Sequence, residues 1–390
     1  MACLFFSLYQ TMFTRSQLGS AENGAELSEA AQAADTALVQ ILRAQITGET
    51  AEAPAPMMLA ERALYHGVAG LLADNARQMQ RWPDAQRALL QQQAVAQAMW
   101  ELQHKAVLRG LLADIAAAGI RPILLKGTAL AYGIYANPAM RSRSDSDILV
   151  PTSALGCVRA VLERAGFERA RPAAGQLQES WTLTFETSGS HDIDLHWAAL
   201  NAPALASIFS YEQALISAQN LPALCPQAWG LSADLALLHA CAHRARHGGY
   251  GEGNRLIWLY DIALLCPMVS AGFTQLAAKA GLSAVCRLAL HDAHSLLGAV
   301  PPAGLTEALA SAPDGAASYY LLQAGAAGQA WRDFTATKGV QARRGFIWHR
   351  LWPGAAALRD KYPQMPKSPV AVLFLRRIGE RALAGIGGKR

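Results

Sequence analysis

The sequence predicts an α+β fold, in which a small mixed sheet with its own helices lies between two helical regions. Of the 390 residues, 52% are apolar and only 16% are charged, which is typical of a folded chain with a large core. Helical periodicity dominates before residue 119 and after residue 200, whereas short apolar or alternating runs fill the stretch between them. Five regions are therefore expected: a poorly ordered segment at 1–30, a helical region at 31–118, an α/β core at 119–200, a helical domain at 201–345, and a C-terminal extension with a basic helix at 346–390.

The N-terminal region is expected to be helical. A first helix is predicted over 35–47, where Asp35 and Thr36 can cap the start and Gly48 can end it. Helical patterns continue over 57–80 and 83–118, after a linker that contains two prolines.

Signals for a membrane or for an oxidising compartment are weak. Met1 to Phe13 is apolar but short, and it lacks a basic start and a clear cleavage site. No uncharged apolar run approaches the ~18 residues of a transmembrane helix. Six cysteines are scattered without metal-binding spacing. We therefore expect a cytoplasmic protein without a transmembrane segment.

The core region alternates strands with short helices. The apolar run at 121–127 predicts a buried strand that meets a tight turn, and Thr128 can cap a helix that reaches Tyr135. The later elements are a strand at 145–150, a helix from Pro151 to Arg164, a strand at 180–187, a hairpin turn at 188–190 and a strand at 191–197. Helices are predicted again at 233–247, 255–266, 273–280, 283–297 and 316–326, and a basic amphipathic helix at 370–384.

Two of the predicted strands carry carboxylates two residues apart. Asp145 and Asp147 open one strand, and Asp192 and Asp194 lie in the other. Because side chains alternate along a strand, each pair points to a single face. Carboxylates gathered on one patch repel each other unless cations neutralise them, so the pattern predicts a Mg²⁺ site. A solvent-facing strand edge is the alternative, but the apolar residues after Asp147 indicate an internal strand.

A Lys-Gly-Thr turn precedes the first of these strands. Gly127 lets a phosphate approach the backbone, and the Thr128 hydroxyl and the N–H groups of the helix start can bind phosphate oxygens. Lys126 adds positive charge. Neither GxxxxGK[ST] nor GxGxxG is present, and on its own this tripeptide is better explained as a plain structural turn.

The motifs, taken in order, resemble a known family. LLKGTALAYGIY, Arg141 ahead of DSDILV, DIDLHW, LLHACAHRARHG and RLIWLYDIALL are similar to the broad bacterial family of uncharacterised nucleotidyltransferases. The resemblance covers roughly residues 107–267. It implies a core with the DNA-polymerase-β-like nucleotidyltransferase fold, and it does not specify the substrate.

The resemblance also implies roles for the carboxylates. Asp145 and Asp147 would be ligands of both divalent ions. Asp194 would be the third carboxylate, which holds the catalytic metal and helps to deprotonate the acceptor hydroxyl. Asp192 faces the same way and is the rival for that role, but the family pattern Asp-Leu-His-Trp favours Asp194. His196 shares this face and is either close to the phosphates or a packed strand residue.

Basic and small residues would bind the nucleotide. Gly127 and Thr128 match the glycine and hydroxyl pair that holds the β and γ phosphates, and Lys126 and Arg141 match basic residues near the triphosphate. Two features depart from the family: a serine stands between the first two aspartates, where an apolar residue is usual, and the stretch from Gly127 to Asp145 is longer than in minimal members.

A helix over 233–247 aligns His239, His243 and His247 on one face. A zinc protease is excluded because HExxH needs a Glu where Ala240 stands. Three interpretations of these histidines remain open. They could form a wall of the nucleotide cleft, which would make His243 a nucleotide-binding residue, or they could bind a metal, or they could be structural. Arg255 and Asp261 on the next helix would pair or line the cleft.

The expected function is a nucleotidyltransferase of the EC 2.7.7 type. It would move a nucleoside monophosphate from an NTP to a hydroxyl or phosphate of an unknown small-molecule or peptide acceptor and release pyrophosphate, with two Mg²⁺ ions, or Mn²⁺, as cofactor. The helical domain at 201–345 would close the nucleotide cleft. The alternatives are transfer of a sugar or another group from a nucleotide-linked donor in peptide tailoring, and a catalytically inactive nucleotide-binding regulator. The net charge of +5 gives no strong nucleic-acid signal. The basic C-terminal helix either contacts a membrane surface or peptide, or packs on the body.

Overall fold

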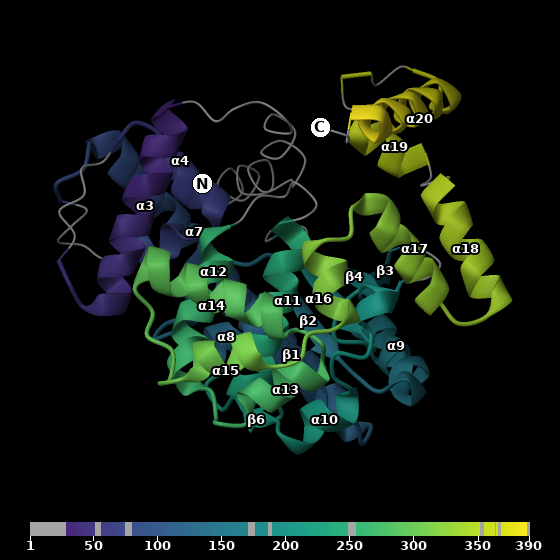
Figure 1. Ribbon diagram of the computed structural model, residues 1–390, viewed down its shortest axis with the longest axis horizontal. Helices are drawn as coiled ribbons and strands as arrows, with labels where there is room; N and C mark the ends of the chain where they lie inside the picture. The colour runs from purple at the N-terminus through teal and green to yellow at the C-terminus, as the bar shows by residue number, and fades with distance from the viewer. Residues whose placement is uncertain are drawn as a thin grey trace.

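A single mixed sheet forms the centre of the chain (Figure 1). The computed structural model describes residues 29–50, 56–74, 80–170, 176–185, 189–248, 255–351, 355–362, 364–365 and 368–387. The sheet has seven strands in the order β3-β4-β5-β2-β1-β7-β6. Their bounds are β1 (Ile123–Leu125), β2 (Asp145–Leu149), β3 (Glu168–Arg169), β4 (Gln178–Phe185), β5 (Gly189–His196), β6 (Gln219–Asn220) and β7 (Trp229–Gly230). The predicted α+β fold is therefore confirmed.

Helices precede, interrupt and follow the sheet. The N-terminal helices are α3 (Glu29–Thr47), α4 (Leu59–His66), α5 (Ala69–Ala73) and α7 (Asp84–Ala117). Those among the strands are α8 (Lys126–Gly133), η1 (Pro138–Met140), η2 (Thr152–Ala154), α9 (Leu155–Arg164), η3 (Pro203–Leu205) and α10 (Tyr211–Ile216). The C-terminal helices are α11 (Ala233–Gly248), α12 (Leu256–Leu265), η4 (Cys266–Met268), α13 (Phe273–Lys279), α14 (Ser283–Leu297), α15 (Leu305–Ser311), α16 (Ala316–Leu322), α17 (Ala326–Ala336), α18 (Val340–Leu351), α19 (Ala355–Lys361) and α20 (Val370–Gly387).

The two faces of the sheet are buried in two separate cores. Ile148 and Val150 point to the core that α7 and α9 complete. Leu149 points the other way, to the core that contains α11, α12, α14 and the N-terminal helices α3 to α5. Because side chains alternate, Asp145 and Asp147 lie on the same face as Leu149. The aspartates therefore face the C-terminal helices, which lie over this side of the sheet in Figure 1.

The predicted elements are largely present, with several differences. Helix α3 begins at Glu29, so Asp35 and Thr36 lie inside it and do not cap its start as predicted. Helix α8 begins at Lys126, two residues before the predicted start, so the Lys-Gly-Thr turn is part of the helix. The helix predicted over 57–80 is divided into α4 and α5, because Gly67 adopts a positive φ of 72° and ends α4. The two-residue strands β3, β6 and β7 were not predicted, since such short strands carry no alternation.

Two of the predicted segments lie partly outside the residues that the structure describes. The poorly ordered segment predicted at 1–30 lies outside the described residues up to position 28, and α3 begins at Glu29. Part of the hairpin turn, at 186–188, is also outside them. Among the described helices, none has the length and apolar character that crossing a bilayer requires.

Candidate active site

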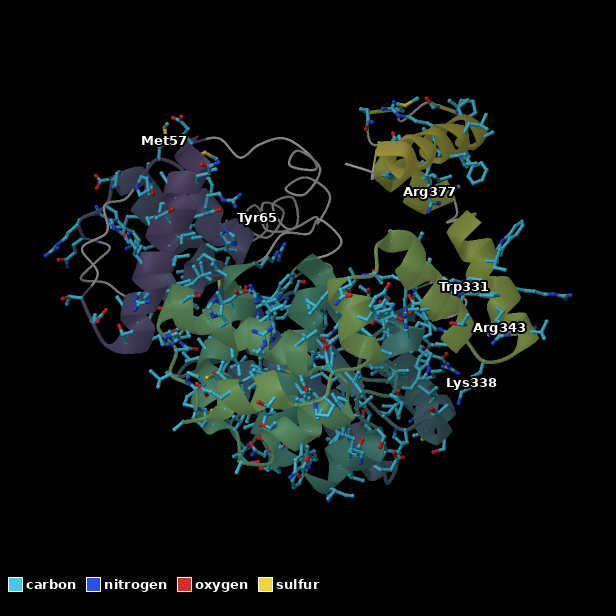
Figure 2. All side chains as sticks on the ribbon, viewed as in Figure 1. Met57, Tyr65, Trp331, Lys338, Arg343 and Arg377 are labelled. Carbon is cyan, nitrogen blue, oxygen red and sulfur yellow. The ribbon has the colours of Figure 1, made fainter. Side chains whose placement is uncertain are left out.

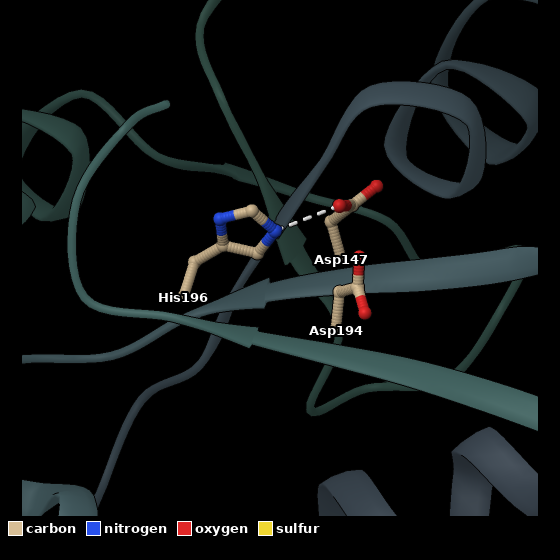
Figure 3. Close-up of side chains that lie close together, drawn as sticks. All are labelled: Asp147, Asp194 and His196. Atoms are coloured by element: carbon tan, nitrogen blue, oxygen red, sulfur yellow. Dashed lines mark hydrogen bonds and ion pairs between the residues drawn. The ribbon is translucent and has the colours of Figure 1, made fainter. Parts of the chain in front are cut away.

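Parallel pairing of β2 with β5 brings the two aspartate pairs together. Asp145 pairs with Asp192, and Asp147 pairs with Asp194, so all four side chains leave one face of the sheet. One ligand atom each from Asp147, Asp194 and His196 lies within 4.8 Å of the others (Figure 3). The sequence pattern predicts that Asp145, Asp147 and Asp194 converge, whereas this group contains Asp147 and Asp194 together with His196 and does not include Asp145.

Asp147 is held by two basic side chains. It is buried, and its Oδ1 accepts hydrogen bonds from Lys126 Nζ at 2.5 Å and from His196 Nε2 at 2.8 Å. Burial alone would raise the pKa of Asp147, but the Lys126 ammonium and the His196 imidazole outweigh it and hold the pKa well below the usual range. Asp147 is therefore ionised at neutral pH.

Strand β4 orients the carboxylates of β5. Gln178, Ser180 and Thr182 alternate along β4 and present their polar ends to the same face. Gln178 Nε2 donates to Asp194 Oδ2 at 2.7 Å, and Ser180 Oγ donates to Asp194 Oδ1 at 2.6 Å. Thr182 Oγ1 donates to Asp192 Oδ1 at 2.6 Å. Asp194 thus has both oxygens fixed beside Asp147, whereas Asp192 lies one pair further along, beside Asp145.

Lys126 provides the positive charge of the site. As the first residue of α8 it has a φ of 48°, a conformation that a lysine rarely adopts, and it directs its ammonium group to Asp147. Burial would lower the pKa of Lys126, but Asp147, Asp145 and Asp194 together raise it. The ammonium group therefore stays charged and faces three carboxylates.

Arg141 is bound within the protein. Its Nε donates to Asp261 Oδ1 at 2.8 Å and its Nη2 to Asp261 Oδ2 at 2.7 Å. The Tyr135 hydroxyl donates to the same carboxylate at 2.6 Å. Asp261 thus pairs with Arg141, whereas the sequence suggested Arg255 as its neighbour. Both Arg141 and Asp261 line the cavity described below, so the pair forms part of its wall.

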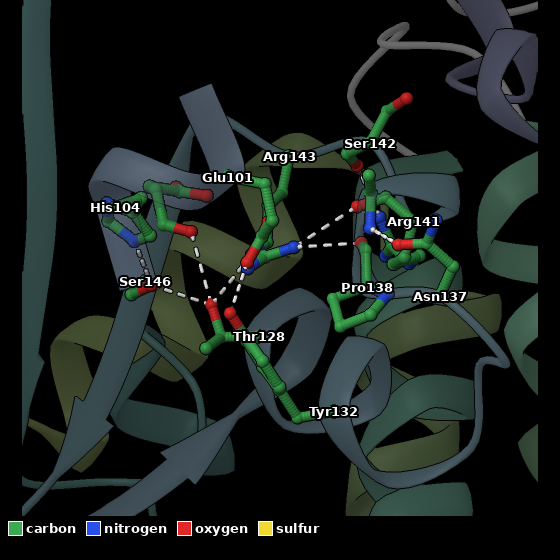
Figure 4. A network of polar contacts seen from close by, with 12 residues as sticks. Glu101, His104, Thr128, Tyr132, Asn137, Pro138, Arg141, Ser142, Arg143 and Ser146 are labelled. Atoms are coloured by element: carbon green, nitrogen blue, oxygen red, sulfur yellow. Dashed lines mark hydrogen bonds and ion pairs between the residues drawn. The ribbon is translucent and has the colours of Figure 1, made fainter. Parts of the chain in front are cut away.

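Thr128 lies behind β2, in a buried polar network (Figure 4). Its hydroxyl accepts a hydrogen bond from Arg143 Nε at 3.0 Å and lies 2.6 Å from Ser146 Oγ. Ser146 points away from the aspartate face and also contacts His104 Nε2 at 2.6 Å. Arg143 Nη2 reaches the Glu101 carboxylate, with 2.8 Å to Oε1. The resemblance implies a phosphate contact for Thr128, but its hydroxyl lies on the opposite side of the strand.

Gly127 serves the same network. A Cβ at this position would lie 3.3 Å from Arg143 Cδ and 3.7 Å from Arg141 Nη1. The glycine therefore makes room for two arginine side chains. Its backbone N–H remains at the first turn of α8, where it is suited to an anion.

A cavity of about 60 Å³ adjoins the acidic group between α8, α11 and α12. Small residues leave this space open, among them Ala129, Gly133, Gly230, Ala236 and Ala240. Its polar and aromatic lining consists of Lys126, Arg141, Gln219, His239, His243, Trp258 and Asp261. The lining of the cavity therefore combines charged, polar and apolar side chains.

Two neutral histidines of α11 form one wall of this cavity. His239 Nε2 donates to the Ala199 carbonyl at 2.8 Å, and burial, followed by the charge of Lys126, lowers its pKa to about 4. The His243 ring meets Trp258 edge to face at 5.2 Å, and burial, with His247 and Lys126, lowers its pKa well below the usual value. Among the described residues the one group placed to bind a metal is Asp147, Asp194 and His196, so a histidine metal site on α11 finds no support.

Sequence reasoning missed several residues of the site. Gln178 and Ser180 belong to the predicted third strand or its edge, and their alternation was the signal that could have placed them beside Asp194. Glu101 and Arg143 gave no such signal, because they meet across 42 residues of sequence.

The residues of the group fit a divalent cation. Carboxylate oxygens are the ligands that Mg²⁺ prefers, and an imidazole nitrogen widens the choice to Mn²⁺ and other transition metals. The Lys126 ammonium and the His196 imidazole keep Asp147 ionised, as a metal ligand must be.

Comparison with known proteins places these motifs in one family. The family model described as "Uncharacterised nucleotidyltransferase" matches residues 56–298, which is more than half of the chain and includes every residue of the site. No curated protein gives a significant match. Membership implies an NTP as substrate and leaves the acceptor open. With adjacent strands that join Asp147 to Asp194 and a family model that spans them, the chain belongs to the uncharacterised nucleotidyltransferase family and is a nucleotidyltransferase.

Proposed function

We propose that the enzyme moves a nucleoside monophosphate from an NTP to a hydroxyl or phosphate of a small-molecule or peptide acceptor, with release of pyrophosphate. The observation that carries this proposal is the pairing of Asp147 with Asp194 beside the Lys126 ammonium. Carboxylates that can hold metal ions, next to an ammonium group, suit the binding of a triphosphate, because its negative charge must be neutralised while a P–O bond breaks.

Each side chain has a separate task in this proposal. Asp145, Asp147 and Asp194 would hold the divalent ions, two Mg²⁺ or alternatively Mn²⁺, which neutralise the phosphate charge when they are bound. Asp194 would also accept the proton of the acceptor hydroxyl, and Gln178 and Ser180 keep its oxygens in place. Each of these roles depends on the register between β2 and β5.

The nucleotide would lie between the sheet and the C-terminal helices. Lys126 would contact the phosphates with its ammonium group, together with the backbone N–H of Gly127. Arg141 would add positive potential from the cavity wall, and His243 would contact the nucleoside. The helical domain predicted at 201–345 would close this cleft, because α11 and α12 supply much of its wall.

Labelled substrates test the reaction. The pure protein is incubated with Mg²⁺ or Mn²⁺, each α-labelled NTP and fractions of a cell extract, and both labelled acceptor and pyrophosphate are measured. We expect both products. Turnover with nucleotide-sugars alone would favour the sugar-transfer alternative. Nucleotide binding without turnover, unchanged by Asp145→Asn, would favour the inactive regulator.

Two neighbouring aspartates supply a matched pair of variants. Asp194→Asn should lower turnover at least ~100-fold, because it removes a ligand and a proton acceptor. It should also weaken Mn²⁺ binding, followed by electron paramagnetic resonance, at least ~10-fold. Asp192→Asn alters a carboxylate on the same strand and face that is also hydrogen-bonded to β4, and it should change both quantities by less than ~3-fold. The reverse order of effects would assign the role to Asp192.

A further inference from the structure

The positive charge of the chain is concentrated at its C-terminus. Residues 331–390, here named the basic arm, contain 13 Lys and Arg against 3 Asp and Glu, a net charge of +10. The preceding 330 residues contain 21 against 26, a net charge of −5. The basic arm begins after residue 298, where the family match ends. It is therefore an addition to the catalytic body with charge of the opposite sign.

The basic arm forms helices at the edge of the molecule. Helices α18, α19 and α20 lie apart from the sheet and its covering helices (Figure 1). Helices α19 and α20 enclose a small core of their own, made by Leu358, Tyr362 and Leu373. The apolar residues of the basic arm thus pack locally and do not join either main core.

Apolar side chains on the surface of the basic arm form a stripe. One side of α18 carries three of these side chains, Val340, Ile347 and Trp348. Ile347 follows Val340 by seven residues, which is about two helical turns, and Trp348 is the next residue. They are 70%, 46% and 67% exposed, and Trp331 of α17 is 66% exposed. Arg344 shares this side, and a shallow groove lies between Arg344, Ile347 and Trp348.

Basic residues lie close to this stripe in the chain, and a second set of exposed apolar residues lies on α20. Lys338 and Arg343 lie with Trp331 at the outer margin of the molecule (Figure 2). On α20, Val372, Leu375 and Ile378 are exposed, and Arg376 lies between them. Exposed tryptophan and aliphatic side chains next to arginines are typical of helices that lie in the interface of a bilayer.

We propose that the basic arm docks this enzyme on an anionic membrane surface. Lys and Arg would lie at the level of the lipid phosphates, and the tryptophan and aliphatic side chains would enter the boundary between headgroups and acyl chains. The helices of the basic arm would lie on the bilayer, since none of the described helices is long and apolar enough to cross it. A nucleic acid is the less suitable partner, because most of the exposed apolar side chains, among them Val340, Ile347 and Leu375, are aliphatic and cannot stack on bases as the two tryptophans could.

Sedimentation with vesicles tests the proposal on the full chain. The protein is mixed with vesicles of phosphatidylcholine alone, or of phosphatidylcholine with about one third phosphatidylglycerol, at low and at physiological salt. We expect binding to the anionic vesicles that weakens as salt rises, and little binding to the neutral ones. Protein that stays in solution with both kinds of vesicle overturns the proposal, and so does binding to single-stranded DNA that anionic vesicles cannot displace.

Matched variants locate the surface. Lys338→Glu with Arg344→Glu should lower vesicle binding at least ~10-fold, and Trp348→Ser should lower it without changing the charge. The control is Arg109→Glu with Arg164→Glu, which makes the same charge change on exposed residues of α7 and α9 and should leave binding within ~2-fold. Circular dichroism confirms that each variant is folded. Equal losses in the two double variants would show that net charge, and not the basic arm, is responsible, and would refute the proposal.

Discussion

Protonation of His239 should destabilise the enzyme at mildly acidic pH. The ring is buried on α11 and donates from Nε2 to the Ala199 carbonyl. Burial and the nearby Lys126 ammonium lower its pKa from 6.5 to about 4. The unfolded chain therefore binds a proton at a higher pH than the folded chain does. It follows that the stability that His239 contributes is present above pH 6.5 and is lost as the pH falls towards 4.

The size of this effect follows from the two pKa values. A difference of about 2.5 units corresponds to about 3.4 kcal/mol over the whole range. Between pH 7 and pH 5 the contribution of His239 falls by about 2 kcal/mol. Burial also lowers the pKa of His104 and of His243, so the wild-type enzyme should lose more than His239 alone accounts for.

Urea unfolding at several pH values isolates the part that belongs to His239. In His239→Gln the side-chain amide can still donate to the Ala199 carbonyl but does not titrate, so its loss of unfolding free energy between pH 7 and pH 5 should be about 2 kcal/mol smaller than that of the wild type. His291→Gln is the control, because His291 is exposed and its ring meets solvent in both states. Parallel pH profiles for wild type and His239→Gln would refute the reasoning.

Three further changes probe the packing around the site, each measured by urea unfolding at pH 7. Glu101→Gln leaves the buried Arg143 charge without its counter-ion and should cost about 3–5 kcal/mol; a loss below ~1 kcal/mol would contradict this. Ser146→Ala removes the hydroxyl partner of His104 and Thr128 and should cost about 1–3 kcal/mol, whereas no change would mean that the network is not formed. Gly70→Ala places a Cβ 3.0 Å from backbone atoms of η1 and should cost about 1–3 kcal/mol. Gly110→Ala, on α7 with nothing within 4 Å, should instead stabilise by up to ~1 kcal/mol, and the same sign for both glycines would refute the steric argument.

The carboxylate face could be predicted because it depends on local geometry. Alternation along a strand fixes that Asp145 and Asp147 share a face whatever the rest of the chain does. Pairing of the two strands then requires only a register, and the observed one sets Asp147 beside Asp194. The role of Lys126 was less accessible, since its contact with Asp147 depends on a positive φ that no residue pattern signals for a lysine.

The buried polar network behind the carboxylate face could not be predicted, because it depends on contacts between segments that are distant in the sequence. Glu101 and His104 are polar residues in a long helix, and the usual expectation for such residues is solvent exposure. In the structure both are buried, and Arg143, just before β2, and Ser146, within β2, provide their hydrogen-bond partners. The hydroxyl of Thr128 belongs to the same network. The local motif predicted a phosphate contact for it because the motif carries no information about these distant partners.

Ser146 stands where the family usually has an apolar residue. The structure explains this difference, because Ser146 connects the polar network on one side of β2 with the carboxylates on the other. Its hydroxyl contacts Thr128, which follows Lys126 by two residues in α8, while its backbone neighbour Asp147 bonds to the Lys126 ammonium. A closed ring of covalent and hydrogen bonds therefore runs from Lys126 through Thr128 and Ser146 to Asp147 and back. In this ring the Lys126 ammonium lies 2.5 Å from Asp147 Oδ1. The geometry that the phosphates would meet is thus set by the fold itself, which is the condition for electrostatic preorganisation.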